Sequence, residues 1–597
     1  MFIRGRAVER IAKERVLYER RPGGDISVCV VYPNIYRLGM ANLGYQAIYH
    51  IFETDPRVAA DRAFLPDRDE LAAINAGGEH LQSFEAGKPL SDFEILAFSI
   101  SFETDYLNVV TMLRLAGIPI RREQRRGRNY PLIIAGGSAI FLNPEPIADF
   151  IDLFLIGEGE ELAPEFLAAY QAARRSDLRA GPRLDAVAQV AGAYLPDYYA
   201  PAYDTAGHLS AVRYSGPGDG KVKRRLVDNL DRFPTSSLIL TEESVFGDMF
   251  LVEASRGCQW GCRFCAAGFM YRPIRYRSPA ALETEARRGL SERRVIGLVG
   301  AEMASVPGVA QLATTVADLG GRLSPSSLKA DCISPGLAQA LARSGNRSVT
   351  IAPEAGSERM RKVINKNLSE PEILLAAERL VGEGVGNLQL YFMLGLPEEQ
   401  DGDVNEIAGL TGRILARMRE RGKAVGRVTV SLNPFVPKPW TPFQWDAMEP
   451  IASLKRKIVS LRSQLGRIAG PSIELDAESP REAYFQVLLS RGDRRTGAIL
   501  ERLDAVGCAD PAAIWPELGR IRTEASGNPA VVNPDRPVLP NPDQYVIRTF
   551  AHEEVLPWDF IDHHIHKWFL LSERKKAHYE HQTKPCDVTR CVVCGAC

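Results

Sequence analysis

The chain alternates short, almost continuously apolar runs with segments whose apolar positions recur at helical spacing. Up to residue 175, the apolar runs cover 26–32, 95–101, 132–135 and 151–156, and helical spacing covers 43–54, 105–117 and 160–174. Such runs are typical of parallel strands buried on both faces. We therefore predict a doubly wound, Rossmann-like α/β domain over residues 1–175. Helical spacing over about 1–24 predicts an N-terminal helix that ends at Arg21-Pro22-Gly23-Gly24.

A second alternation of strands and helices follows from residue 246. Predicted strands cover 250–254, 295–300, 328–332, 348–353, 386–394 and 427–433, with helices at 281–292, 335–343 and 370–382 between them. Six such units fit a partial (β/α)6 TIM-like barrel over residues 246–450, whose site lies at the carboxyl ends of the strands.

Three further regions complete the predicted α/β architecture. Prolines and glycines interrupt residues 176–245, which we interpret as a linker. Residues 451–547 read as helices followed by a loop rich in Pro and Asn. Residues 548–597 form a tail rich in Cys and His.

Composition narrows the function classes. The 597 residues carry a net charge of −1, so net charge gives no support to nucleic-acid binding, although it does not exclude a local basic patch. The start lacks the apolar segment of a signal peptide, and no apolar run is long enough to span a membrane. We therefore expect a cytoplasmic protein with no membrane partner.

Cysteine usage points to metal chemistry rather than disulfides. Of the ten cysteines, seven lie in two tight groups. Cys29, Cys332 and Cys508 are isolated, and we predict that they are buried, inert thiols.

The first group is Cys258, Cys262 and Cys265, spaced C-x3-C-x2-C after an apolar run. Soft thiolate ligands select iron–sulfur clusters, and three of them can hold three irons of a 4Fe-4S cube while the fourth iron stays open. A structural zinc site is the alternative, but zinc usually takes four protein ligands, and no fourth Cys or His lies near.

This motif, with an aromatic residue before its last cysteine, resembles that of the radical S-adenosylmethionine (SAM) enzymes. The resemblance implies that the open iron binds the amino and carboxylate groups of SAM, and that one electron cleaves SAM to a 5′-deoxyadenosyl radical. It also implies a reducing partner such as flavodoxin or ferredoxin.

Further segments match the order of the family's SAM-binding motifs. Gly300-Ala301-Glu302 follows the second predicted strand, with alanine at the family's middle glycine. Ser334 follows the third strand, and Glu354 and Arg359 follow the fourth. The resemblance implies that these residues bind SAM, with the arginine near the SAM carboxylate.

The first domain resembles the cobalamin-binding domain that precedes the barrel in many radical SAM enzymes. Small and polar residues follow its predicted strands, where such sheets bind ligands. The DxHxxG motif, which supplies a histidine to cobalt, is absent, so bound cobalamin would lack that ligand. The alternative is a domain that keeps the fold and binds nothing. The cobalamin-contacting residues implied are Asn34, Ser99, Ser101, Gly136, Gly137, Gly157 and Glu158.

The tail carries the second cysteine group, Cys586, Cys591, Cys594 and Cys597. Four thiolates can close a second site, and we favour an auxiliary 4Fe-4S cluster over zinc. The segment 556–562 before it resembles an uncharacterised branch of cobalamin-type radical SAM proteins.

Nearby aromatic and imidazole groups allow two interpretations each. His563, His564 and His566 are either acid/base or axial ligand groups at the barrel mouth or a polar helix face. Trp440, Phe443 and Trp445 either stack on a planar substrate or cofactor or form an aromatic plug between the barrel and the next helices.

Three functions remain open from the sequence. The first is a cobalamin-dependent radical SAM methyltransferase acting on an unactivated carbon. The second is a methylthiotransferase-like or other radical modification of tRNA or protein that uses the tail cluster. The third is a non-enzymatic iron–sulfur electron carrier or cobalamin-binding regulator.

Overall fold

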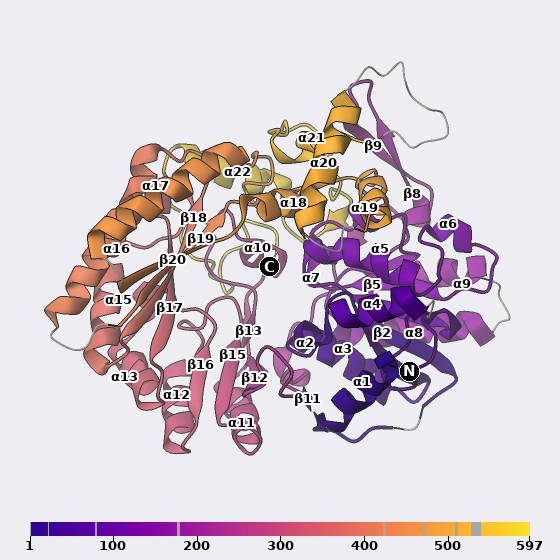
Figure 1. Ribbon diagram of the computed structural model, residues 1–597, viewed down its shortest axis with the longest axis horizontal. Coiled ribbons are helices and arrows are strands. Elements are labelled where there is room, and N and C mark those ends of the chain that lie inside the picture. Colours follow the sequence, from indigo (N-terminus) through magenta and orange to yellow (C-terminus); the bar gives the residue numbers. More distant parts are fainter. Residues whose placement is uncertain are drawn as a thin grey trace.

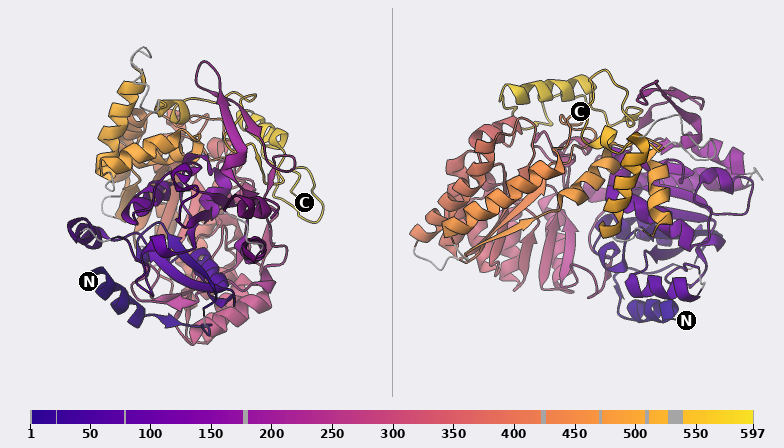
Figure 2. Two further views of the ribbon diagram at one scale, coloured as in Figure 1. Left: turned by 90° about the vertical axis from the view of Figure 1, so that its right-hand side faces the viewer. Right: turned by 45° about the horizontal axis from the view of Figure 1, so that its top comes forward.

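The computed structural model describes residues 2–21, 23–77, 80–175, 180–421, 426–469, 472–507, 511–526 and 539–596. Figure 1 shows two lobes: the N-terminal domain in indigo and purple, and the barrel in pink and orange. The last segment, in yellow, runs along one side of both lobes (Figure 2).

The N-terminal domain is built on a six-stranded sheet that confirms the doubly wound prediction. Its first five strands in spatial order are parallel, and the last is antiparallel to its neighbour. Counted along the chain with β2 as the first strand, the five parallel strands lie in the order 2-1-3-4-5. The direction in which strands are added reverses between β2 and β4, where such folds bind ligands. The order is β3 (Val58–Phe64), β2 (Ile26–Tyr32), β4 (Ile95–Ser99), β5 (Leu132–Gly136), β6 (Leu153–Leu155) and β7 (Ala193–Tyr194).

Strand β3 was absent from the sequence prediction because Asp61 and Arg62 interrupt its apolar run. Both side chains are buried, and Arg62 is neutralised by Glu14 and Glu85, whose carboxylates lie 2.6 and 2.5 Å from its guanidinium. Burial of a charge is tolerated where the charge is paired. Local hydrophobicity therefore understates this strand.

Helices cover the sheet largely where helical spacing predicts them. They are α2 (Tyr36–Gly39), α3 (Leu43–Thr54), α4 (Arg68–Gly77), α5 (Tyr106–Leu115), α6 (Arg122–Arg125), α7 (Ser138–Leu142) and α8 (Gly159–Arg175). The N-terminal helix α1 (Phe2–Ala12) is shorter than expected, because β1 (Arg15–Val16) leaves it to pair with β11 (Ile239–Leu240).

Residues 180–245 are more ordered than the predicted linker. They contain α9 (Ala180–Val187), the hairpin of β8 (Tyr199–Tyr203) and β9 (Leu209–Tyr214), and β10 (Val222–Lys223). Strand β7 completes the N-terminal sheet, and β10 pairs with β21 (Ile561–Asp562) of the tail. The linker interpretation is therefore wrong for these residues, because their short strands pair with partners distant in sequence.

The second lobe is a partial barrel of parallel strands. A three-stranded sheet, β12 (Met249–Glu253), β15 (Val295–Val299) and β16 (Arg322–Pro325), continues into a four-stranded sheet through a bridge between Leu328 and Ile351. The second sheet comprises β17 (Ser348–Glu354), β18 (Asn387–Leu394), β19 (Val428–Pro434) and β20 (Ile473–Ala477).

Two details of the barrel correct the prediction. The third strand lies at 322–325, and the predicted segment 328–332 instead holds a short 3₁₀ turn (Ala330–Cys332). Strand β20 adds a seventh strand within the region predicted as helical, because its alternation of half-buried and exposed residues is that of an edge strand.

Outer helices cover the barrel, and further helices join the lobes. The first set is α11 (Pro279–Leu290), α12 (Val309–Asp318), α13 (Pro335–Arg343), α14 (Glu358–Val363), α15 (Glu370–Glu383) and α16 (Asp401–Glu420). Helix α17 (Ile451–Ala469) also covers the barrel, where it packs against α16 and β20. The second set is α18 (Pro480–Arg491), α19 (Thr496–Ala505), α20 (Pro511–Ser526), α21 (Asp543–Val546) and α22 (Lys567–His578). Of the loop predicted over 521–547, residues 527–538 lie outside the described residues.

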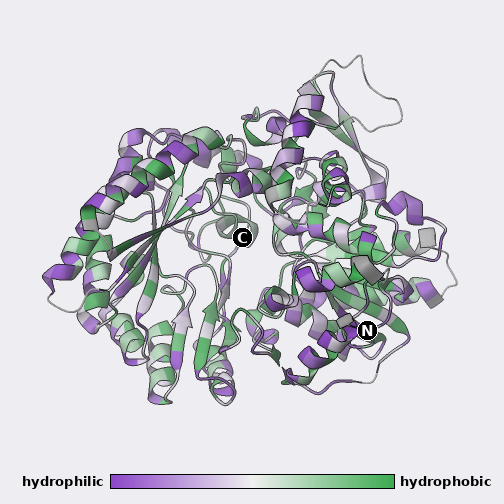
Figure 3. Ribbon diagram, in the orientation of Figure 1, coloured by the Kyte–Doolittle hydropathy of each residue, from purple (hydrophilic) through white to green (hydrophobic). Residues whose placement is uncertain are grey.

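Apolar residues concentrate on the central strands of both lobes, while the outer helices turn hydrophilic faces outward (Figure 3). In the described part of the chain, no helix combines the length and apolar character that crossing a membrane requires.

Candidate functional site

The cysteine loop begins directly after the first barrel strand. Strand β12 ends at Glu253, and β13 (Ser255–Arg256) pairs with β14 (Arg275–Tyr276), so residues 257–274 form an excursion closed at its base by a two-stranded ladder. Gly257 has φ +84°, and a Cβ there would lie 2.7 Å from the carbonyl oxygen of Tyr271. Glycine is therefore required at this turn.

The loop is held in place by side chains from the rest of the barrel. The Asn365 amide donates to the carbonyl of Gly261 at 3.0 Å. The fully buried guanidinium of Arg263 donates to the carbonyl of Val363 at 2.7 Å and pairs with Glu573 at 3.2 Å. These contacts fix the backbone that carries the three thiols.

The three thiols lie in a buried, partly cationic environment. Burial and the neighbouring thiols raise the pKa of Cys258 to about 12, and burial raises that of Cys262 to about 11. The positive charges of Lys366 and Lys329, both buried, act in the opposite direction on Cys262. Metal ligands must be deprotonated, so a bound cation would add to the effect of these lysines and stabilise the thiolate form.

Among the described residues, no three Cys, His, Asp or Glu side chains are close enough to ligate a single metal ion. In a 4Fe-4S cube each thiolate binds a different iron, so convergence is not a requirement for a cluster. The buried thiols of the loop and their cationic neighbours fit such a cluster.

The residues predicted to bind SAM lie beyond successive strands, and most of their side chains already have partners. Glu302, after β15, accepts hydrogen bonds from the backbone N–H groups of Ala304 and Ser305 at 2.7 and 2.9 Å. Glu302 therefore orders the turn that follows it, at residues 302–305. Glu354, at the end of β17 with φ +67°, lies 3.2 Å from Lys366.

Ser334 and Arg359 are also engaged. The Ser334 hydroxyl caps α13 by accepting from the Leu337 N–H at 3.2 Å. The Arg359 guanidinium pairs with Asp403 and with Glu580 of the tail, the latter at 3.4 Å. Binding of a SAM carboxylate by Arg359 would therefore compete with these acids, and its predicted role remains a prediction.

A cavity of about 490 Å³ lies between the N-terminal domain and the barrel. Its walls include the ends of β4 and β5 and the loop after β6, and the barrel contributes Glu253, Arg256, Tyr271 and Val299. Val299 is the last residue of β15, next to the SAM motif at Gly300. Of the predicted cobalamin residues, those that line the cavity are Ser99, Ser101, Gly136, Gly137, Gly157 and Glu158.

Asn34 is not part of this wall. Its amide donates to Asp105 at 2.7 Å and its carbonyl oxygen accepts from the Ile35 N–H at 2.8 Å. The predicted contact of Asn34 with a ligand is therefore replaced by support of Asp105, a buried carboxylate behind the cavity wall.

The glycines of the cavity wall are required by the chain itself. Gly137 has φ +112° and Gly157 has φ +141°. A Cβ on Gly137 would lie 2.3 Å from the Ile100 carbonyl oxygen, and one on Gly157 would lie 2.5 Å from the Arg225 nitrogen. Close backbone packing, rather than a ligand alone, accounts for these residues.

Three exposed apolar residues at the cavity edge were not identified from the sequence. Phe102, Phe246 and Val299 line the cavity and are exposed by 57%, 43% and 37%. They come from three separate segments, so no local sequence pattern predicts that they lie together. Their only sequence signal is an apolar residue at a predicted strand end, which is weak.

The tail lies directly against the cysteine loop. The backbone N–H of Cys586 donates to the carbonyl of Gln259, between Cys258 and Cys262, at 2.7 Å. Thr583 is bound by Asn365 and Asn367 at 2.7 and 3.0 Å. Cys594 is buried, Cys586 and Cys591 are half-buried, and Cys597 lies outside the described residues.

The histidines before α22 do not form a polar helix face. His563 is fully buried, its Nε2 lies 2.7 Å from the carbonyl oxygen of Phe141, and burial lowers its pKa to about 3. His566 precedes the first residue of α22, and its N–H donates to the Cys594 carbonyl at 2.9 Å. The helix-face interpretation is wrong because these residues precede the helix.

The tryptophans and Phe443 form the plug that was one of the two predictions. Trp440 packs edge-on against His563 at 4.8 Å, Phe443 against Phe435, and all three predicted aromatic residues are buried. Of the isolated cysteines, Cys29 is buried as predicted, Cys332 is half-buried, and Cys508 lies outside the described residues.

Comparison with known proteins gives the class of the chain. Residues 44–196 match the family "Radical SAM proteins, N-terminal", and residues 252–411 match the "Radical SAM superfamily". The chain therefore belongs to the radical SAM superfamily, and it is an enzyme; the electron-carrier and regulator alternative is set aside. Membership implies a 4Fe-4S cluster and SAM.

Individual similarities are more distant. The uncharacterised protein MJ0966 of Methanocaldococcus jannaschii is 27% identical over 479 residues, which is 80% of this chain and 90% of that protein. Among solved structures, the cobalamin-dependent SAM radical enzyme OxsB is 14% identical with a TM-score of 0.47, over 85% of this chain and 69% of OxsB. The radical SAM methyltransferase TsrM from Kitasatospora setae is 13% identical with a TM-score of 0.48, over 80% of this chain and 98% of TsrM.

Proposed function

We propose that this radical SAM enzyme transfers a methyl group to an unactivated carbon, with a cluster at Cys258, Cys262 and Cys265 and cobalamin in the interdomain cavity. The observation that carries the proposal is the shared cavity of about 490 Å³, whose wall joins the carboxyl ends of the N-terminal strands to Val299, beside the SAM motif. Its volume is in the usual range of small-molecule sites.

The cofactors would supply the difficult chemistry: a 5′-deoxyadenosyl radical to remove hydrogen from the substrate, and a methyl group to replace it. The chain's own residues would position these cofactors and limit their contact with solvent. The loop 257–274 holds the thiols in a partly buried setting, and the wall formed by Ser99, Ser101 and Gly136 would hold the corrin beside the barrel mouth. A one-electron reductant such as flavodoxin or ferredoxin is the expected partner.

The test is anaerobic reconstitution with iron, sulfide and hydroxocobalamin. We expect cobalamin to remain bound after desalting, and 5′-deoxyadenosine to form with SAM and dithionite. Replacing Cys258, Cys262 and Cys265 by Ala should abolish 5′-deoxyadenosine formation, whereas Cys29→Ala, a thiol buried in β2, should retain it. Failure to retain cobalamin would overturn the methyl-transfer proposal, and survival of SAM cleavage in the triple variant would overturn the cluster assignment.

A second candidate function is favoured by the contact between Cys586 and Gln259. A tail cluster held by Cys586, Cys591, Cys594 and Cys597 would lie against the radical loop, where it could serve a sulfur-inserting or other radical modification of tRNA or protein. Two cubes require about eight irons per chain. About four irons with one zinc would exclude the tail cluster and this second function.

A further inference from the structure

A network of buried charges joins the N-terminal domain to the base of the cysteine loop. It consists of Glu158 from the loop after β6, Glu160 from the first turn of α8, Glu253 at the end of β12, and Arg256, Arg275 and Arg277 from β13, β14 and the residue after β14. We call these six residues the interdomain clamp. The three acids balance the three arginines, so the network carries no net charge.

Arg256 is the centre of the clamp. Its Nη1 lies 3.2 Å from Glu158, another nitrogen pairs with Glu160, and its Nε lies 2.8 Å from Glu253. Glu158 and Glu160 belong to the N-terminal domain, whereas Glu253 belongs to the barrel. Arg256 thus links the two lobes, where β12 and β13 face the N-terminal domain (Figure 1).

Glu158 is held from two sides. Both terminal nitrogens of the Arg275 guanidinium donate to its carboxylate, at 2.7 and 2.8 Å, and the Val227 N–H donates to it at 2.9 Å. Such bidentate pairs define orientation as well as contributing energy. Because Glu158 and Arg275 are both buried, removing the charge of Glu158 would leave Arg275 without its countercharge at high cost.

The clamp lies next to the chemistry on both sides. Gly157, Glu158, Gly159 and Glu160 all line the cavity. Arg256 is two residues from Cys258, a separation of roughly 7 Å at most along the chain, and the intervening Gly257 is confined by the Tyr271 carbonyl. A displacement of Glu158 would therefore move the start of the cysteine loop.

We infer that Glu158 and Glu160 are positioning residues: through Arg256 they set the orientation of the cysteine loop relative to the interdomain cavity. The segment 157–160, which runs from the loop after β6 into α8, lines the cavity and also holds Arg256, which lies two residues before the first thiol. This inference rests on the proposed function and extends it: the two carboxylates would align the cluster with the cobalamin in the cavity. The action on the loop depends only on radical SAM chemistry, not on cobalamin.

The test compares Glu158→Gln and Glu160→Gln with Glu165→Gln, a control on the same helix. Glu165 is exposed and pairs with Arg225 outside the cavity wall. The main readout is the electron paramagnetic resonance spectrum of the dithionite-reduced, reconstituted protein with SAM; the second is the rate of 5′-deoxyadenosine formation. Iron content and thermal unfolding are measured on every variant.

We expect both clamp variants to retain iron but to show an altered SAM-bound spectrum, with SAM cleavage slowed about 10- to 100-fold, as misplacement of reacting groups typically causes. The control should match the wild type. A purely structural role would lower the unfolding temperature and leave the spectrum unchanged, and wild-type spectra and rates in both variants would overturn the inference. If Glu158→Gln fails to fold, Glu160→Gln, whose carboxylate has fewer partners, decides the outcome.

Cobalamin is measured separately by its absorbance after desalting. If no protein retains it while the clamp variants still alter the spectrum, the methyl-transfer proposal fails and the positioning inference stands. If every protein retains cobalamin and the spectra do not change, the positioning inference fails and the methyl-transfer proposal stands.

Discussion

At the scale of single residues, burial without a charged partner distinguishes Asp105 from the paired acids of the clamp. Asp105 is 2% exposed, and its partners are the neutral amides of Asn34 and Asn108, at 2.7 and 3.4 Å. Burial raises the pKa of Asp105 from 3.8 to about 7, against the effect of these hydrogen bonds. The folded protein therefore holds this proton more tightly than the unfolded chain does.

The consequence is a defined dependence of stability on pH. Between pH 4 and 7 Asp105 is protonated in the folded state and ionised in the unfolded state, so its contribution to the free energy of unfolding decreases as pH rises, by at most about 1.4 kcal/mol per pH unit. Asp105→Asn, which keeps the amide contact, should remove this decrease. Urea unfolding at pH 5 and pH 7.5 measures it.

The matched control is Asp92→Asn, an exposed acid of the same domain. It should leave the difference in stability between the two pH values as it is in the wild type. The interpretation of Asp105 fails if both variants retain the wild-type difference.

At the scale of elements, helix α22 fastens the tail onto the cysteine loop. Glu573 on this helix pairs with Arg263 at 3.2 Å, and both side chains are at most 2% exposed. Lys576 and the Thr583 hydroxyl also bind Glu573, at 2.7 and 2.8 Å. The helix therefore supports the loop through the buried side chain of Arg263.

Glu573→Gln should destabilise the protein by about 3 kcal/mol, because Arg263 would keep its carbonyl contacts but lose its buried countercharge. We also expect the variant to lose iron faster than the wild type in the presence of a chelator. Urea unfolding and iron release measured over time test both effects.

Glu580→Gln is the control for this helix end. Glu580 is exposed and pairs with Arg359 at 3.4 Å, so its loss should cost less than about 1 kcal/mol. Equal destabilisation by the two substitutions would contradict a specific role of the Glu573–Arg263 pair.

Elements with uniform patterns could be predicted from the sequence, and elements defined by distant partners could not. Strand β2 is a run of seven residues that are nearly all buried, and its prediction at 26–32 is confirmed. Strand β3 needs the charges of Glu14 and Glu85 to bury Arg62, and β10 exists through pairing with β21, more than 300 residues later. Neither partner is visible in a local window.

The same distinction applies to the site. Motif spacing identified the thiols and six residues of the cavity wall, because these follow strand ends. It could not show that Glu158 is already bound by Arg275, that Glu302 accepts from its own loop, or that Ser334 caps a helix. Those roles depend on which partners the fold places next to each side chain.

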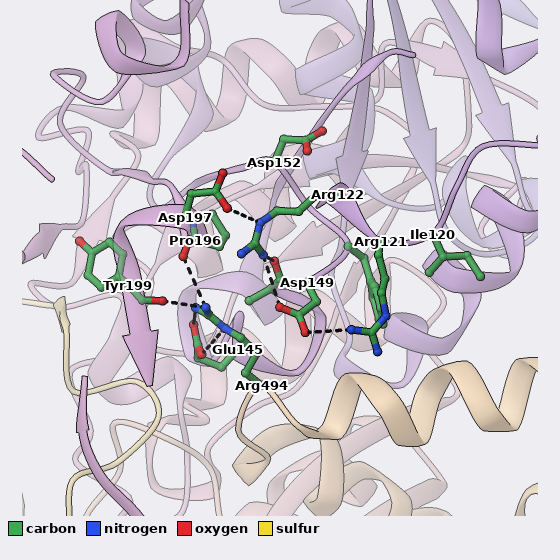
Figure 4. Close-up of polar contacts among 12 residues, drawn as sticks. Ile120, Arg121, Arg122, Glu145, Asp149, Asp152, Pro196, Asp197, Tyr199 and Arg494 are labelled. Atoms are coloured by element: carbon green, nitrogen blue, oxygen red, sulfur yellow. Dashed lines mark hydrogen bonds and ion pairs between the residues drawn. The ribbon is translucent and has the colours of Figure 1, made fainter. Parts of the chain in front are cut away.

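At the scale of the whole molecule, the helical region 480–505 connects the lobes through polar contacts. Arg494 reaches into the N-terminal domain, where it pairs with Glu145 at 3.0 Å and donates to the carbonyl of Tyr199 at 2.7 Å (Figure 4). Arg121 meets Glu501 at 2.6 Å, and Lys438 meets the buried Glu103 at 2.6 Å. These pairs bring the lobes on either side of the cavity into one unit.

Arg494→Met should uncouple the lobes. Glu145 is buried, and loss of its guanidinium partner should weaken this interface by about 3–5 kcal/mol, because a carboxylate would remain without a countercharge. Scanning calorimetry is expected to show one transition for the wild type and two for the variant, because the N-terminal domain would unfold separately.

Arg502→Met is the control, since Arg502 pairs with Glu517 and Glu524 within the helical region. This variant should lower the transition temperature and still unfold in one transition. Two transitions in the wild type, or one in Arg494→Met, would show that the lobes are joined by other contacts.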